Sequence, residues 1–271
     1  MHIHNHIQHG SKMEIHELVP QLILTLPFIM ALVIYLCAVI LTKKRKKSWR
    51  FFRMVLWIGG LSCSLAAISG PMAARSHQDF TSHMLGHLLL GMLAPLLMVL
   101  AAPMTLILRT LNVKQARLLS RIIKSNPIRF ISNPIVASLL NVSGLWVLYT
   151  TSLYQTMQHN ALLHSVVHLH VFLAGYFFTA AFIYTDPHPH RTSNLFRSSV
   201  LIIALACHGI LSKYIYAHPP MGVPVAQAKT GALLMYYGGD AIDLILITIF
   251  CYQWFKETRP RTTQVYFEHK E

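Results

Sequence analysis

FTSHMLGHLLLGMLAPLLMVL, residues 80–100, is the stretch that decides the fold. Its only titratable side chains are two histidines, His83 and His87. A helix needs about 20 consecutive apolar residues to cross a bilayer, and the apolar run that begins here, 81–106, is longer than that. Because histidine is costly to place in lipid, the two rings require partners or a ligand inside the protein.

The rest of the chain repeats this pattern. Hydrophobic residues make up 54% of the 271 positions and charged residues only 12%, against roughly 25% charged residues in soluble domains. Seven runs are long and apolar enough to span a membrane: 18–41, 50–70, 81–106, 134–154, 161–184, 198–217 and 231–254. We therefore expect an all-α, polytopic integral membrane protein built as a bundle of seven transmembrane helices.

Basic residues gather in alternate loops of this topology. Most of the 23 Lys and Arg follow the first, third, fifth and seventh spans. The positive-inside rule then places the N-terminus outside and the C-terminus in the cytoplasm. We expect a histidine-rich outer tail (1–17), a membrane domain (18–254) and a cytoplasmic tail (255–271). The net charge of +14 is explained by orientation, so nucleic-acid binding is not expected.

Two histidine pairs share the spacing of one helical turn. His83 and His87 fall in the third span, and His164 and His168 in the fifth, both toward the outer side. Residues four apart lie on one face of a helix and can reach one ion. Imidazole suits copper, zinc, iron and nickel, whereas a thioether such as that of Met84 favours reduced copper. The pattern predicts a metal site, with copper as the preferred ion.

A second group of polar residues lies deeper in the bundle. Asp240 and Asp243 lie in the seventh span, His208 in the sixth and His170 in the fifth. Such residues inside a membrane are expected to face the bundle and to pair. They form either a proton or metal relay, or structural hydrogen bonds between helices.

Catalytic motifs are absent from the sequence. It contains no HExxH, GxSxG or Walker pattern, and only nine acidic residues. We therefore expect a protein that binds and transfers something rather than an enzyme.

The residues above resemble the CtaG family of cytochrome c oxidase assembly factors. The resemblance is carried by HMLGHLLLGMLAPLLMVLAAPMTLILRTL (83–111), by the histidine-rich stretch 159–178 and by AQAKTGALLMYYGGDAIDL (226–244). Ala226 departs from the pattern, since an acidic residue is expected before Gln227. The resemblance implies a multi-pass protein of the bacterial plasma membrane, associated with copper-centre formation, whose partners are oxidase subunits.

Three other functions stay open at this point. Facing histidines on two helices are also typical of haem ligation, so a haem-binding electron-transfer protein is one alternative. The deep aspartates and His208 fit a metal or proton transporter with a midplane site. The third alternative is a scaffold for oxidase subunits that binds no metal.

Overall fold

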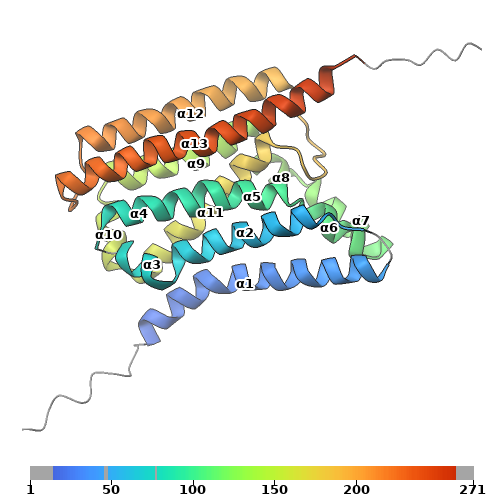
Figure 1. The fold of residues 1–271 in the computed structure, drawn as a ribbon, viewed down its shortest axis with the longest axis horizontal. Coiled ribbons are helices and arrows are strands. Elements are labelled where there is room, and N and C mark those ends of the chain that lie inside the picture. The colour runs from blue at the N-terminus through green and yellow to red at the C-terminus, as the bar shows by residue number, and fades with distance from the viewer. Residues whose placement is uncertain (1–14, 46–47, 77, 261–271) are drawn as a thin grey trace, which may run out of the picture.

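The molecule is an elongated bundle of helices, as a computed structural model of residues 15–45, 48–76 and 78–260 shows (Figure 1). The helices are α1 (Ile15–Lys44), α2 (Phe51–Ile68), α3 (Gly70–Ser76), α4 (Phe80–His87), the π-helix η1 (Leu88–Leu93), α5 (Ala94–Leu100), α6 (Pro103–Thr110), α7 (Val113–Ile123), α8 (Asn126–Ile131), α9 (Pro134–Thr150), α10 (Leu153–His159), α11 (Ala161–Phe182), α12 (Asn194–Ala217) and α13 (Val225–Thr258). The predicted all-α class is therefore confirmed, and the histidine-rich outer tail lies almost wholly outside the described residues.

Six segments of the described chain are long and apolar enough to cross a membrane. They are Leu22–Lys44, Phe51–Ile68, Phe80–Leu100, Ala161–Phe182, Asn194–Ala217 and Val225–Thr258. A seventh crossing is added if α9 and α10 form one broken span. These two helices are bent by 78° relative to each other, so the predicted fourth span is a shorter straight helix followed by a sharp turn.

The segment formed by α4, η1 and α5 is the central element of the bundle. It packs against α2, α11 and α13. In its most apolar window 67% of the residues are buried, whereas the other five long segments reach 33% or less. The sequence that carries His83 and His87 is therefore surrounded by protein rather than by lipid.

This central segment ends earlier than the predicted bound at residue 106. The helix stops at Leu100, and Ala102 adopts a left-handed conformation with φ of 53°. Pro103 then begins α6, which is the position where a missing N–H does not cost a helical hydrogen bond. The chain turns here because Pro103 has no N–H with which to continue the preceding helix and disfavours a right-handed helical conformation at Ala102.

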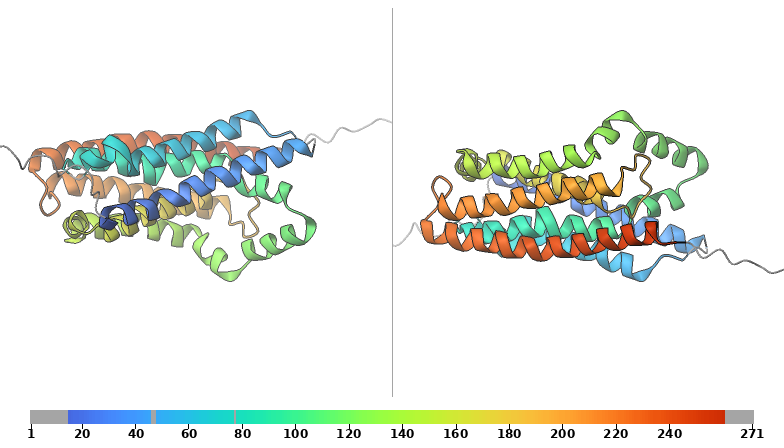
Figure 2. Two further views of the ribbon diagram at one scale, coloured as in Figure 1. Left: turned by 90° about the horizontal axis from the view of Figure 1, so that it is seen from below. Right: turned by 90° about the horizontal axis from the view of Figure 1, so that it is seen from above.

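The bundle has two ends of different composition. We call the end formed by α3, α10 and the loop 218–224 the histidine end, and the end formed by α6, α7, α8 and the loop 183–193 the basic end (Figure 1). Helices α7 and α8 stand away from the long helices (Figure 2). Because α7 carries three basic residues, with a fourth at its C-cap, opposite an apolar face, it is an amphipathic helix of the kind that lies on a membrane surface.

Short polar side chains begin several of the helices. Asn112 forms a capping box with Gln115 at the start of α7, and Asn133, Asn160 and Ser193 accept backbone N–H groups at the starts of α9, α11 and α12. Each cap satisfies a donor that the first turn would otherwise leave unpaired. These residues also give the sequence its clearest helix-start signals.

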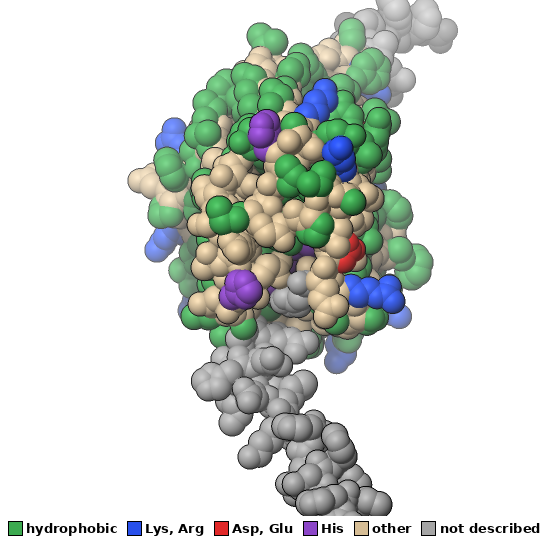
Figure 3. All heavy atoms as spheres, turned by 90° about the vertical axis from the view of Figure 1, so that its left-hand side faces the viewer, with side chains coloured by type: hydrophobic (Ala, Val, Ile, Leu, Met, Phe, Trp, Pro, Cys, Tyr) green, Lys and Arg blue, Asp and Glu red, His purple; other side chains and the backbone are tan. Residues whose placement is uncertain are grey.

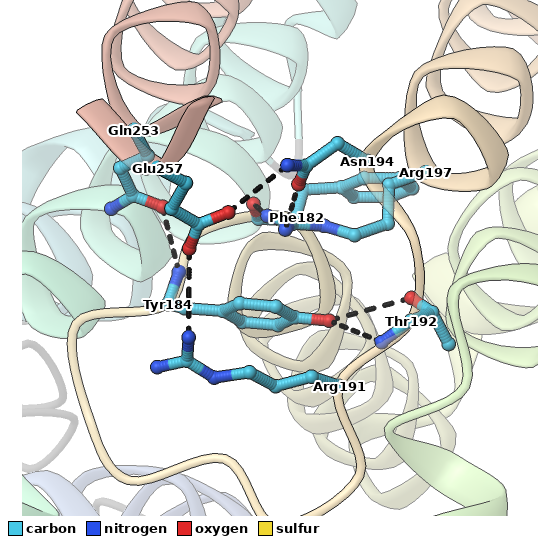
Figure 4. Close-up of polar contacts among 8 residues, drawn as sticks. All are labelled: Phe182, Tyr184, Arg191, Thr192, Asn194, Arg197, Gln253 and Glu257. Atoms are coloured by element: carbon cyan, nitrogen blue, oxygen red, sulfur yellow. Dashed lines mark hydrogen bonds and ion pairs between the residues drawn. The ribbon is translucent and has the colours of Figure 1, made fainter. Parts of the chain in front are cut away.

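Arg197 joins three elements at the basic end (Figure 4). Its side chain is only 2% exposed. It donates hydrogen bonds to the carbonyl of Phe182, at the end of α11, and to Asn194. Its guanidinium lies 3.8 Å from the Tyr184 ring centroid and 4.8 Å from that of Phe250 on α13. The buried cation thus caps α11 and fixes it against α12 and α13.

Candidate functional site

The first turn of α4 is held from two directions. Asp79 caps the helix by accepting hydrogen bonds from the N–H groups of Thr81 and Ser82, at 3.3 and 2.9 Å. The N–H of Phe80 donates to the side-chain oxygen of Gln227 on α13, at 3.0 Å. Burial raises the pKa of Asp79, but the hydrogen bonds from Ser82 and Thr81 outweigh it and keep that pKa below its usual range. The carboxylate therefore stays ionised and fixes the helix that carries the histidines.

A π-helix follows His87 directly. Its i to i−5 bond is seen where the N–H of Ala94 donates to the carbonyl of Leu89. Pro95 has no N–H to offer the carbonyl of Gly91, so that carbonyl is free to turn outward. It lies against Gly175 of α11, where an added Cβ would overlap the Gly91 oxygen. Such π segments occur frequently at functional sites, and this one brings two backbones into direct contact.

Histidines of α4 and α11 face each other at the histidine end. The ring centroids of His83 and His168 lie 6.0 Å apart. His83 Nε2 is 3.1 Å from the hydroxyl of Tyr149, and its ring is 5.0 Å from that of Tyr154. His164 stacks on His168 at 4.0 Å, and His168 Nδ1 lies 2.9 Å from the His164 carbonyl. The third and fifth predicted spans are therefore neighbours.

Two small internal cavities meet at His87. The first is about 10 Å³ and is lined in part by His83, His87 and His168. The second is about 30 Å³ and is lined in part by His87, His208 and Asp243. A cavity of about 10–15 Å³ is the smallest that holds one water molecule. The two spaces therefore have the size of single waters or ions, and His87 lines both.

Two of the rings that line these cavities are buried and incompletely hydrogen-bonded. His87 is 6% exposed, and neither of its ring nitrogens has a hydrogen-bond partner among the described residues. His208 is 7% exposed, and its Nε2 likewise has none there. The two ring centroids lie 6.3 Å apart. Because buried polar atoms are nearly always paired, these nitrogens mark a place for a proton, a water or an ion.

The two deep aspartates are placed differently. Asp243 is buried and lines the larger cavity, whereas Asp240 is exposed and does not line it. Asn141 of α9, Thr179 of α11 and Met92 of η1 line the same cavity. The cavity thus has carboxylate, amide, hydroxyl and thioether groups beside its two histidines.

The remaining predicted residues lie around this centre. His170 is exposed on α11 and packs against Gly144 of α9, where an added Cβ would be 2.5 Å from His170 Nε2. Met84 is fully buried, and its Cγ would be 3.2 Å from a Cβ at Gly231. Within the described residues, no three His, Cys, Asp or Glu side chains are grouped to hold a metal ion. The sites defined here are therefore pairs of rings, not closed cages.

The cluster is covered at the histidine end. Viewed from this side, the surface is mostly apolar and neutral atoms with scattered charged side chains (Figure 3). His83 and His168 are only 4% and 9% exposed. An ion reaching these rings must therefore enter between helices and lose its water.

Sequence reasoning missed four residues that shape the site. Tyr149 and Tyr154 contact His83 from α9 and α10, and Asn141 and Thr179 line the larger cavity. An asparagine in the middle of an apolar span was a usable signal, because such residues face the interior of a bundle. The tyrosines gave no such signal, since aromatic residues are common at span ends.

Comparison with known proteins assigns the chain to a family. Similar proteins include an uncharacterized protein of Mycobacterium bovis and one of Mycobacterium tuberculosis, each 30% identical over 173 residues, which is 61% of this chain and 26% of theirs. One from Mycobacterium leprae is 28% identical over 181 residues, 64% of this chain and 28% of its own length. The chain thus spans about a quarter of these relatives, and no solved structure matches it.

The family match covers a larger part of this chain than the alignments with these relatives do. A sequence model described as cytochrome c oxidase caa3 assembly factor (Caa3_CtaG) matches residues 33–257, from the middle of α1 to the end of α13. The multiple apolar helices fit the multi-pass membrane protein that this role requires. The chain belongs to the Caa3_CtaG family of cytochrome c oxidase assembly factors.

Proposed function

We propose that this assembly factor binds copper between the facing histidines of its central helices and helps to deliver it to a haem–copper oxidase. Copper is then cargo that the protein takes up and releases, and no covalent chemistry is involved. The observation that carries the proposal is the buried His87 ring, which lines two ion-sized cavities and whose two nitrogens have no partner among the described residues.

The ring separations support copper as the ion. Imidazole nitrogen binds first-row metals at about 2.0 Å, so two rings with centroids about 6 Å apart can reach one ion between them. His83 with His168, at 6.0 Å, and His87 with His208, at 6.3 Å, both meet this condition. Reduced copper accepts few ligands, and the thioether of Met92 beside the second pair favours it over zinc. His164 and Met84 stay predicted ligands of the first pair.

Weak, open coordination suits a delivery protein. A closed structural site would hold the ion against transfer, whereas two-ligand sites release it readily to a partner with more ligands. The positive-inside rule favours the basic end in the cytoplasm. The histidine end then lies on the outer side of the bacterial plasma membrane. Copper would then enter from outside and leave toward an oxidase subunit in the same membrane.

The test compares histidines that differ only in position. The double variant His87→Ala, His168→Ala removes one ring from each facing pair. The control His170→Ala removes an exposed ring from α11, the helix that carries His168. We expect the double variant to lose copper in the purified protein and to lower the copper content of the oxidase, and His170→Ala to change neither. Wild-type copper content in the oxidase of cells that make the double variant would overturn the proposal.

Haem binding is less well supported by the cavities. Small-molecule sites usually have volumes of about 300–1,000 Å³, whereas the spaces beside the histidines are about 10 and 30 Å³. A Soret absorption band in the purified protein would contradict this reasoning and favour the haem-binding alternative.

Transport of a metal or a proton is the second candidate. It is favoured by Asp243, which is buried and shares the larger cavity with His87 and His208. Uptake into liposomes that is lost in Asp243→Asn but kept in Asp240→Asn would support it, because only the first carboxylate lines the cavity. Absence of uptake by the wild type leaves delivery as the function.

A further inference from the structure

A much larger cavity lies at the basic end, away from the histidines. Its volume is about 500 Å³, within the range of small-molecule sites. It lies between α1, α5 and α11 and is closed on one side by α7 and α8. Ile34 and Leu173 line it and are also exposed to the surroundings of the bundle. The cavity is therefore accessible from the level of the bilayer.

The lining is apolar along most of its length. Trp57, Met98, Phe172 and Tyr176 line it from α2, α5 and α11. Trp57 is 6% exposed and its Nε1 has no hydrogen-bond partner among the described residues. Such a long apolar chamber with one buried donor suits a flexible hydrocarbon chain better than a polar metabolite.

One end of the cavity is polar. His188 and His190 lie there on the loop 183–193, and His188 Nδ1 and His190 Nε2 are buried without a partner in the described chain. Asp186 is also there, but its oxygens already accept hydrogen bonds from Met104 and Thr105. Burial lowers the pKa of His188, and the smaller effect of a hydrogen bond to the backbone of Asp186 raises it. The neutral imidazole of His188 is available to donate to a ligand oxygen.

Helix α7, which lines the same cavity, carries positive charge on its exposed face. Its Leu119, Ile122 and Ile123 line the cavity. Its basic residues, with the one at its C-cap, are all exposed, and none forms an ion pair with a described carboxylate: Lys114, Arg117, Arg121 and Lys124. Basic pockets between membrane helices on the cytoplasmic side are known to bind anionic lipid head groups. A ligand here should combine an apolar chain with a negative charge.

We propose that this cavity binds an anionic phospholipid, with an acyl chain along Trp57 and Tyr176 and the phosphate beside α7 and the loop 183–193. A neutral quinone or a neutral lipid would fill the apolar part but would leave the cations of α7 without a partner. This inference rests on residues outside the histidine cluster and does not depend on copper binding.

The test uses the full chain in mild detergent and the fluorescence of Trp57. Because Trp57 is buried, bulk lipid reaches it poorly, and bromine-labelled acyl chains quench it only from within the cavity. The Trp57 signal is the difference between the wild type and Trp57→Phe. We expect brominated phosphatidylglycerol to quench it at concentrations about tenfold below those needed for brominated phosphatidylcholine.

Two variants and their controls separate the apolar and the charged contribution. Ala180→Phe fills the cavity and should abolish quenching, whereas Ala241→Phe, on an exposed face of α13, should not. Replacing Arg121 and Lys124 by Gln should weaken phosphatidylglycerol binding about tenfold and leave phosphatidylcholine unchanged. Replacing the exposed Lys213 and Lys229, on α12 and α13, should change neither.

Two results would overturn the proposal. The first is equal binding of the two lipids by the wild type, which would remove the role of charge. The second is quenching that survives Ala180→Phe in a protein that keeps its thermal stability, which would place the lipid elsewhere. Because the charge variants lie on the surface of α7, they test the proposal even if Ala180→Phe does not fold.

Discussion

The contact between Gly91 and Gly175 gives the sharpest test of the fold. Gly175 lies in the middle of α11, where alanine is normally preferred to glycine by about 1 kcal/mol. A Cβ there would overlap the Gly91 oxygen and would lie 2.9 Å from the Gly91 carbonyl carbon and 3.3 Å from Pro95 Cγ. The nearest atoms belong to the backbone of η1, which cannot rotate away as a side chain can. Gly175→Ala must therefore push two packed helices apart.

Gly209→Ala is the matched control for this substitution. Gly209 also lies within a long helix, but the nearest atom to its added Cβ is Tyr236 Cε2, at an ordinary 3.7 Å. Both variants gain the same helix propensity, so the difference between them reports the steric cost alone. Overpacking a core costs about 1–3 kcal/mol, and contact with backbone places Gly175→Ala at the upper end.

The measurement is the free energy of unfolding in mixed detergent micelles. We expect Gly209→Ala to be stabilised by up to about 1 kcal/mol and Gly175→Ala to lie about 2–3 kcal/mol below it. If the two variants are equally stable, α11 does not approach η1 as described, and the placement of His168 beside His83 loses its support.

Three further substitutions test the supports of the site and the fold. Arg197→Met should lower the free energy of unfolding by about 2–4 kcal/mol, because it leaves the Phe182 carbonyl buried without its donor and removes the cation–π contacts; a neutral result would contradict the capping role. Tyr149→Phe should cost about 1 kcal/mol by removing the hydroxyl that bonds the His83 ring, measured in the same unfolding assay. Asp79→Ala should cost about 1 kcal/mol at neutral pH, as loss of a helix cap does. Since the pKa of Asp79 is lowered in the folded state, this difference should be complete above about pH 4 and shrink as the pH falls further, and a gap independent of pH would exclude the carboxylate as its cause.

The apolar runs predicted most of the fold because a bilayer imposes a simple length rule. Six of the seven expected spans coincide with long helices, with shifts at their ends. The fourth did not, because the chain bends by 78° at the exposed, extended Thr151, which hydropathy does not signal. The early end of the third span, at Leu100, depends on the left-handed Ala102, which no propensity of alanine would suggest.

The candidate site was predictable in its residue types but not in its pairing. Helical spacing alone placed His83 beside His87, and His164 beside His168. It could not show that His83 faces His168 or that His87 faces His208, since these contacts depend on how α4, α11 and α12 are arranged. His170 illustrates the limit: it lies two residues from His168, yet it is exposed on α11 against Gly144.

The histidine cluster and the large apolar cavity for which we propose a lipid (the lipid cavity) are built on the same two elements. His87 lies on the central segment four residues before Gly91, and Met98, which lines the lipid cavity, lies seven residues after it. On α11, His168 precedes Gly175, and Tyr176 of the lipid cavity follows it. A helix rises about 1.5 Å per residue. The contact between Gly91 and Gly175 therefore lies within about 11 Å, measured along the helix axes, of these residues of both sites.

A larger side chain at this contact should therefore disturb both sites together. We expect Gly175→Ala to reduce both copper content and Trp57 quenching by phosphatidylglycerol, and Gly209→Ala to reduce neither. Ala180→Phe gives the comparison, because it fills the lipid cavity without touching the Gly91 carbonyl. Loss of lipid binding with normal copper content in Ala180→Phe, but loss of both in Gly175→Ala, would identify the backbone contact as the shared support. Loss of only one property in Gly175→Ala would show that the two ends of the bundle are held independently.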